Sequence, residues 1–166
     1  MKSQVQKPVM LVLFLLASCI FNHTSAQTST KPLSGRVPLS KLSAKAKAYI
    51  TDNYKGYKAV GAAYDPLCSG GDAIDVSVSK PNSPTYSLIF LLDGTFIQQE
   101  IDVPFAEAPP KVLETLKSKY ASYKYSKQIE KLQLVDKKIQ YMVDISKGKT
   151  EKEVIFDDQG AVVCEN

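Results

Sequence analysis

The residues that carry most hydrolytic and metal-dependent chemistry are sparse in this chain of 166 residues. Its one histidine, His23, lies in an N-terminal segment that we expect to be removed. Without an imidazole, neither a Ser-His-Asp nor a Cys-His arrangement can be built, and a zinc site loses its commonest ligand. Cys68 would then be a nucleophile without a base, so a structural role suits it better. We therefore expect no catalytic residue and no enzyme.

Three further groups of residues could bind a ligand or take part in catalysis, but the sequence around each of them does not support that role. The Asp-Asp pair at 157–158 could contribute to a calcium site, but the acidic spacing of a calcium-binding loop is missing, and aspartate in turns caps its own backbone. The Ser-Gly-Gly segment at 69–71 lacks the lysine and the helix that follow a phosphate-binding loop. Asp75 and Asp144 fall on different predicted strands, with no sign of the separation that paired-carboxylate chemistry needs. The sequence thus predicts no metal site and no cofactor.

The first 26 residues have the pattern of an export signal. Lys2 and Lys7 make a basic start, the apolar run 9–21 is too short to span a bilayer comfortably, and a small-x-small site ends at Ala26. Cys19 ends a Leu-Ala-Ser-Cys segment that resembles the lipobox of bacterial lipoproteins. We expect a periplasmic or secreted protein cleaved near Ala26, with a lipid-anchored envelope protein as the alternative.

Removal of this segment changes the charge and the cysteine count. Two lysines leave with it and no acid does, so Lys+Arg falls from 21 to 19 against 17 acids, and the formal net charge falls from +4 to +2. So small a charge gives no argument for nucleic-acid binding. Cys68 and Cys164 remain, in a chain sent to an oxidising compartment. Their spacing in sequence does not determine the distance between their Cα atoms, so a disulfide and two thiols both stay open.

A tandem repeat organises the rest of the chain. Between residues 85 and 96 an apolar run reaches an Asp-Gly turn and resumes, which predicts a β-hairpin because Gly94 can take a positive φ. The stretch 154–163 repeats the pattern, with Phe156 and Gly160 matching Phe90 and Gly94 at a separation of 66 positions.

Each repeat contains one helical pattern and four strand patterns. The first helix is expected behind Ser43 and the second behind two prolines at 109–110. The expected strands are 57–64, 73–79, 85–92 and 95–101, then 128–135, 139–146, 152–156 and 161–164. We predict an α+β fold of two tandem α-β-β-β-β repeats, with an antiparallel meander sheet and both helices packed on one face. The expected organisation is a signal peptide at 1–26, a flexible lead-in at 27–39, and repeats at 40–104 and 105–166.

The sheet face away from the helices is the candidate binding surface. If the two matched phenylalanines face the helices, strand alternation turns their neighbours to the other side. Exposed apolar side chains gathered on a sheet are typical of a binding surface, although the lead-in or a second copy could also cover them, or they could be scattered. The residues concerned are Ile89, Leu91, Met142 and Ile155.

The doubled order of short helix, Tyr-x-x-Tyr helix end, alternating strands and Phe-x-x-[Asp/Gln]-Gly hairpin resembles the PepSY-like, β-lactamase-inhibitor-like proteins exported by Bacteroidetes. It covers about 37–166. The resemblance implies a periplasmic or surface protein whose repeats form a curved antiparallel sheet, similar to that of the secreted β-lactamase inhibitory proteins. Those inhibitors press the concave face against an enzyme and insert hairpin tips that carry an acidic residue. PepSY domains more generally are thought to restrain peptidases.

Two segments correspond to such hairpin tips. The first, 65–72, carries Asp65 and Asp72 but also Cys68; the second, 80–84, has no carboxylate. These departures put β-lactamase itself in doubt as the target. Our hypothesis is a non-enzymatic exported binding module, an inhibitor or regulator of a periplasmic enzyme of the peptidase or β-lactamase class. The alternative is a small-ligand or structural envelope protein, anchored by a lipid at Cys19. We expect a protein partner in the envelope, no nucleic acid and no transmembrane helix in the mature chain, and the oligomeric state stays open.

Overall fold

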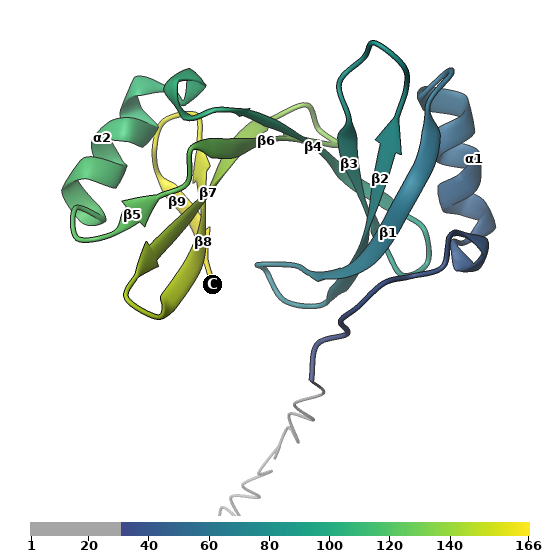
Figure 1. The fold of residues 1–166 in the computed structure, drawn as a ribbon, viewed down its shortest axis with the longest axis horizontal. Helices are drawn as coiled ribbons and strands as arrows, with labels where there is room; N and C mark the ends of the chain where they lie inside the picture. The colour runs from purple at the N-terminus through teal and green to yellow at the C-terminus, as the bar shows by residue number, and fades with distance from the viewer. Residues whose placement is uncertain (1–30) are drawn as a thin grey trace, which may run out of the picture. The chain divides into compact units, whose positions relative to one another are not determined.

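The computed structural model describes residues 31–166 (Figure 1). The predicted signal peptide and Cys19 lie outside the described residues. None of the helices in 31–166 is long and apolar enough to cross a membrane.

Two similar sets of elements follow each other along the chain. The first is η1 (Leu39–Lys41), α1 (Ala44–Asn53), β1 (Lys58–Pro66), β2 (Asp72–Ser79), β3 (Tyr86–Leu91) and β4 (Phe96–Pro104). The second is η2 (Phe105–Glu107), α2 (Pro110–Lys119), β5 (Lys124–Tyr125), β6 (Gln128–Leu134), β7 (Ile139–Lys147), β8 (Thr150–Asp157) and β9 (Val162–Glu165).

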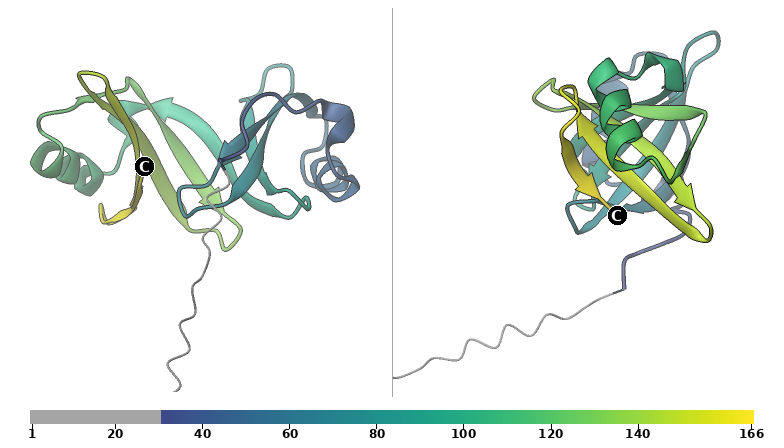
Figure 2. Two further views of the ribbon diagram at one scale, coloured as in Figure 1. Left: turned by 90° about the horizontal axis from the view of Figure 1, so that it is seen from below. Right: turned by 90° about the vertical axis from the view of Figure 1, so that its left-hand side faces the viewer.

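All strands join one antiparallel sheet. Its order is β1-β2-β3-β4-β6-β7-β8-β9, and the short β5 pairs with the end of β7. The sheet is strongly curved, and both helices lie on its outer, convex side (Figures 1 and 2). The predicted α+β fold, a meander sheet with helices on one face, is confirmed.

Contacts recur between the two halves at the spacing of the sequence repeat. The Tyr54 hydroxyl donates to Gln99 Oε1 at 2.6 Å, and 66 positions later the Tyr120 hydroxyl donates to Glu165 Oε2 at 2.7 Å. Lys45 of α1 forms an ion pair with Asp93 in the turn of the first hairpin. At the matching positions of the second half, Lys111 of α2 donates a hydrogen bond to Gln159 Oε1. The repeat is therefore one of tertiary contacts as well as of sequence.

The repeated hairpin glycine is the point where the sheet meets the helix. Gly94 (φ +88°) and Gly160 (φ +78°) are both buried, and a Cβ atom on either would strike the first turn of α1 or α2. In the second hairpin this Cβ would come within 2.5 Å of the Lys111 carbonyl oxygen. Glycine is required there for two reasons, the positive φ and the lack of space.

Side chains and prolines define where the helices begin, and an aspartate closes the second hairpin. Ser43 Oγ accepts a hydrogen bond from the Ala46 amide at 3.1 Å and so caps α1, as predicted. Pro109 and Pro110 open α2. Asp157 Oδ1 accepts bonds from the amides of residues 159 and 161, which is the turn role that its position favoured over calcium binding.

Each half has its own hydrophobic core between its helix and the convex face. The first core contains Ala46 and Ile50 of α1 with Val76, Val78, Leu88 and Phe90 of the sheet. The second contains Val112 and Leu116 of α2 with Ile129, Val143, Ile145, Val154 and Phe156. No residue belongs to both cores, so the packing of one half does not depend directly on that of the other.

The end of the predicted lead-in is ordered, unlike the flexible tether expected for 27–39. Arg36 forms a β-bridge with Ala63, the Val37 amide donates to the Ala62 carbonyl at 2.8 Å, and Val37 is buried. These bonds cover the outer edge of β1, which would otherwise present unpaired backbone groups. Apolar periodicity could not reveal this pairing because it involves a single valine.

Candidate functional site

The concave face of the sheet can be assigned residue by residue from the strand register. Residues paired across an antiparallel ladder share a face, and successive residues alternate. Because Leu88 and Phe90 belong to the core under α1, their neighbours Ser87, Ile89 and Leu91 lie on the concave side. The same register through β4, β6, β7 and β8 places Met142 and Ile155 opposite each other on that side.

The four apolar residues predicted for this face are all on it, but they are not equally accessible. Leu91 is 38% exposed, whereas Met142 and Ile155 are partly buried. Ile89 is fully buried, so the expectation that it is exposed was wrong. Ala73 and Leu132 share this face by register and are also fully buried. Curvature explains the difference, because side chains on the inside of a strongly bent sheet crowd one another.

Carboxylates dominate the concave face. Register places acids of both halves there, on strands from β1 to β8, and of these only Asp65 was assigned to the binding surface from the sequence, as part of a hairpin tip. They are Asp65, Asp75, Glu100, Asp102, Glu130, Asp144, Glu151 and Glu153. Period-two alternation could have identified each one singly, but their convergence depends on the bend of the sheet.

Three adjoining clefts follow this face. The largest, about 710 Å³, lies between Asp65 and Pro66 of β1 and the β7–β8 region, with Asn166 at its rim. A second, about 300 Å³, is lined by six of the carboxylates, and the described residues that line it include no lysine or arginine. A third, about 200 Å³, shares Asp102, Glu130 and Met142 with the second. Together they form a groove across the inside of the sheet.

The electrostatics of the second cleft favour protonation. Burial, followed by the charges of Asp75 and Glu153, raises the pKa of Asp65 to about 6. Burial and the neighbouring Glu130 raise the pKa of Glu100 to about 8, and burial raises the pKa of Glu130 to about 7. Burial also raises the pKa of Asp75, against an opposing hydrogen bond from a serine hydroxyl.

One polar atom in this cleft lacks a partner. Asp75 Oδ1 is buried and has no hydrogen-bond partner among the described residues. A buried carboxylate oxygen without a donor is costly, which agrees with the raised pKa of this group. Asp75 is therefore more easily accommodated in its neutral form.

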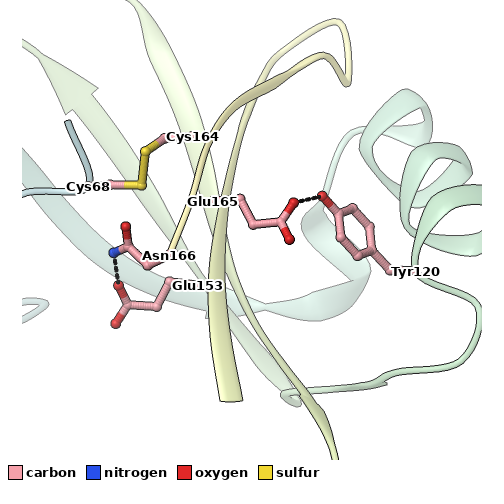
Figure 3. Close-up of a disulfide and its surroundings, with 6 residues drawn as sticks. All are labelled: Cys68, Tyr120, Glu153, Cys164, Glu165 and Asn166. Carbon is pink, nitrogen blue, oxygen red and sulfur yellow. Dashed lines mark hydrogen bonds between the residues drawn. A yellow bond between two sulfur atoms is a disulfide. The ribbon is translucent and has the colours of Figure 1, made fainter. Parts of the chain in front are cut away.

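A disulfide links the two ends of the sheet across the mouth of the groove. Cys68, in the loop after β1, and Cys164, in β9, are bonded with their Cα atoms 6.1 Å apart (Figure 3). Beside them the Asn166 side chain donates to Glu153 Oε2 at 3.2 Å. The first and last strands of the sheet order are thus held close together, and the sequence alone had left this pairing open.

The two acidic residues predicted at the first hairpin tip, Asp65 and Asp72, lie in different parts of the structure and have different contacts. Asp65 lies on the concave face and lines the two larger clefts. Asp72 begins β2 and accepts a hydrogen bond from the Leu33 amide at 2.9 Å, so it fastens the N-terminal segment to the sheet. Because Cys68 ties this hairpin to β9, the tip cannot move freely into a partner.

Within residues 31–166, no group of three or more histidine, cysteine or acidic side chains is placed to hold a metal ion. Fold and groove together define a class of protein: a curved antiparallel sheet made from a tandem repeat, with helices outside and a polar concave face.

Solved structures from Bacteroides share this fold. No protein-family model and no curated protein matches the sequence. A DUF2874 family protein from Bacteroides uniformis is 16% identical, with a TM-score of 0.54 over 74% of this chain and 87% of that one. A BLIP-like protein from Bacteroides fragilis is 16% identical, with a TM-score of 0.52 over 80% and 88%. A protein from Bacteroides eggerthii, provisionally named as periplasmic, is 14% identical, with a TM-score of 0.54 over 80% and 89%. Because the identities are this low, these matches show a shared fold alone.

Proposed function

We propose that this chain is an exported, non-enzymatic binding module that inhibits or regulates an envelope enzyme of the peptidase or β-lactamase class through its concave face. One observation carries the proposal: the sheet face that no helix covers is grooved and lined with carboxylates from both halves. The names of the BLIP-like and periplasmic structures support it by analogy of fold. The lack of histidine after residue 23 supports a non-enzymatic role.

The charge of the groove specifies the chemistry of the partner. Six carboxylates line the second cleft, so a partner that inserts an acidic or purely apolar segment would leave them uncompensated. A projecting loop with lysine or arginine would meet complementary charge, which favours both fast association and the correct register. We therefore expect the bound enzyme to present a basic segment to the groove, whereas the sequence resemblance implied that this chain inserts an acidic hairpin tip into the enzyme.

A matched pair of charge reversals tests this function. Asp144 is exposed on the concave face, and Glu114 is exposed on the outer side of α2. The exported protein is immobilised and challenged first with envelope extract and then with each purified enzyme that it retains. We expect Asp144→Lys to weaken binding and inhibition roughly tenfold or more, because it places a cation in an acidic groove. Glu114→Lys, with the same change in net charge, should leave both unchanged. Equal loss in the two variants, or loss in Glu114→Lys alone, would rule out the concave face.

The size of the largest cleft favours one second candidate. A volume of about 710 Å³ lies within the range typical of small-molecule sites. In this second candidate the chain binds a small cationic ligand in the envelope. Retention of no protein from an extract that contains active envelope enzymes would favour it over the regulator.

The lipid-anchored alternative concerns residues outside the described part of the chain. A mature mass that begins at a diacylated Cys19 would establish it, and a mass that begins at Gln27 would establish cleavage after Ala26.

A further inference from the structure

The seam between the two halves of the sheet is an unusual place for a pair of acids. Strands β4 and β6 form the ladder that joins the halves, and the disulfide adds a second link at the far ends. Each half has a separate hydrophobic core under its own helix. The backbone bonds and side chains of the β4–β6 ladder therefore carry much of the coupling between the halves.

Glu100 and Glu130 face each other across this seam. Glu100 on β4 pairs with Leu132 of β6, so Glu130 is its diagonal neighbour on the same face, within reach of a long side chain. Glu100 is only 7% exposed and is the one buried charged residue in the described part of the chain. Gln98 Nε2 donates to Glu100 Oε1 at 2.6 Å, and Glu100 and Glu130 line the same cleft. Two carboxyl groups in this position can form a hydrogen bond with each other only when one of them carries a proton.

Every charged group that faces this pair from the packed strands is acidic. They are Asp65 on β1, Asp75 on β2, Asp102 on β4, Asp144 on β7 and Glu153 on β8, and Tyr86 on β3 is the other titratable group of the cleft. The lining within the described residues contains no lysine or arginine. Lys127, just before β6, lines the adjoining third cleft beside Glu130, but no lysine or arginine among the described residues lines the second cleft, so a shared proton is what would hold the pair together there.

We propose that Glu100 and Glu130 form a proton-operated latch on the β4–β6 seam: with one proton shared they bridge the two halves, and loss of that proton loosens the seam by repulsion of two buried charges. The same acids line the groove, so the latch would also link groove geometry to pH. This inference concerns the fold itself and holds whether or not an enzyme binds the concave face.

The direction of the pH effect follows from the sign of the shifts. Burial, followed by the charge of Glu130, raises the pKa of Glu100 to about 8, and burial, with the charges of other acids on this face, raises the pKa of Glu130 to about 7. Both values lie above the ordinary glutamate value, so the folded chain binds more protons than the unfolded chain. The stabilisation is complete below the ordinary value of 4.5 and is lost as pH rises towards about 8. The pKa values of Asp93 and Glu165 are lowered instead. The stability that these two acids contribute is lost only as pH falls into the acidic range, so they do not affect the change between pH 6.0 and 8.5.

Equilibrium unfolding at two pH values tests the latch. The disulfide-intact exported protein is unfolded with urea at pH 6.0 and at pH 8.5 and constant ionic strength. We expect the unfolding constant to rise roughly tenfold to hundredfold between these pH values. Glu100→Gln keeps a hydrogen-bond donor without a charge, so it should remove most of this rise and be more stable than the native protein at pH 8.5. Glu114→Gln, exposed on α2, should retain the native pH dependence.

A second measurement on the unmodified protein locates the effect and does not depend on a variant folding. Amide hydrogen exchange, corrected for intrinsic rates, should show protection lost between pH 6.0 and 8.5 first in the β4–β6 ladder, and later in β2–β3 and β7–β8. Uniform loss across the three ladders would overturn the proposal, and so would a Glu100→Gln variant whose pH dependence matches that of the native protein. Loss of the latch with retained enzyme inhibition would leave the proposed function intact.

Discussion

Replacing Cys68 and Cys164 together by serine removes the covalent link between the first hairpin and the last strand. The bond closes a loop with a sequence separation of 96 residues, for which the chain-entropy relation gives a stabilisation of about 4–5 kcal/mol. In a unit of this size each kcal/mol corresponds to roughly 3–5 °C in Tm. We therefore expect the double variant to unfold roughly 12–25 °C below the native protein, because its unfolded state is no longer constrained.

Thermal and urea unfolding followed by far-UV circular dichroism measure this effect. The m value should increase, since the unfolded chain without the cross-link exposes more surface. Removing both cysteines avoids the intermolecular disulfides that a single variant would form. Ser69→Ala is the matched control, because Ser69 is exposed in the same loop and the disulfide is retained.

A fall in Tm of less than about 5 °C in the double variant would refute the reasoning, since it would mean that the unfolded chain is already compact without the bond. A fall of the same size in Ser69→Ala would instead attribute the loss to the loop. Native circular dichroism with a lower Tm would show that each half keeps its own helix-covered core.

Two further predictions concern packing. Gly160→Ala should lower the free energy of unfolding by about 2–4 kcal/mol, because its Cβ would strike the Lys111 carbonyl as well as force an unfavourable φ. Gly148→Ala, at φ +64° but in open space, should cost only about 1 kcal/mol in the same urea titration, and equal costs would contradict the steric explanation. Ile89→Ala should cost about 2–5 kcal/mol because it leaves a cavity where a fully buried side chain packs, and a cost below about 1 kcal/mol would show that Ile89 is accessible.

Much of the fold could be predicted because its signals are local. The Asp-Gly hairpin and the matching glycine at 160, the serine cap at 43 and the two prolines before α2 each act through neighbouring atoms. Strand alternation likewise placed Leu91, Met142 and Ile155 on the face away from the helices. These features depend on φ, ψ and side-chain direction over a few residues, so a single sequence is enough to reveal them.

The candidate site was predictable only in part because it depends on curvature. Alternation predicts which face a side chain points to, but it does not predict how far the sheet bends. The bend buries Ile89, which alternation alone leaves exposed, and it gathers acids that lie far apart in sequence, such as Asp65 and Glu153. The acidic groove was therefore missed, although each of its members was visible in the sequence.

The sequence by itself determined the repeat, the positions of the turns and caps, and the two faces of each strand, since all of these follow from local conformational preferences and period-two alternation. Only the tertiary structure decided that Cys68 meets Cys164, that residues 35–37 cover the edge of β1, and that Glu100 meets Glu130 at the seam. Those contacts depend on strand order, twist and the close approach of distant segments, which a chain establishes only when it folds.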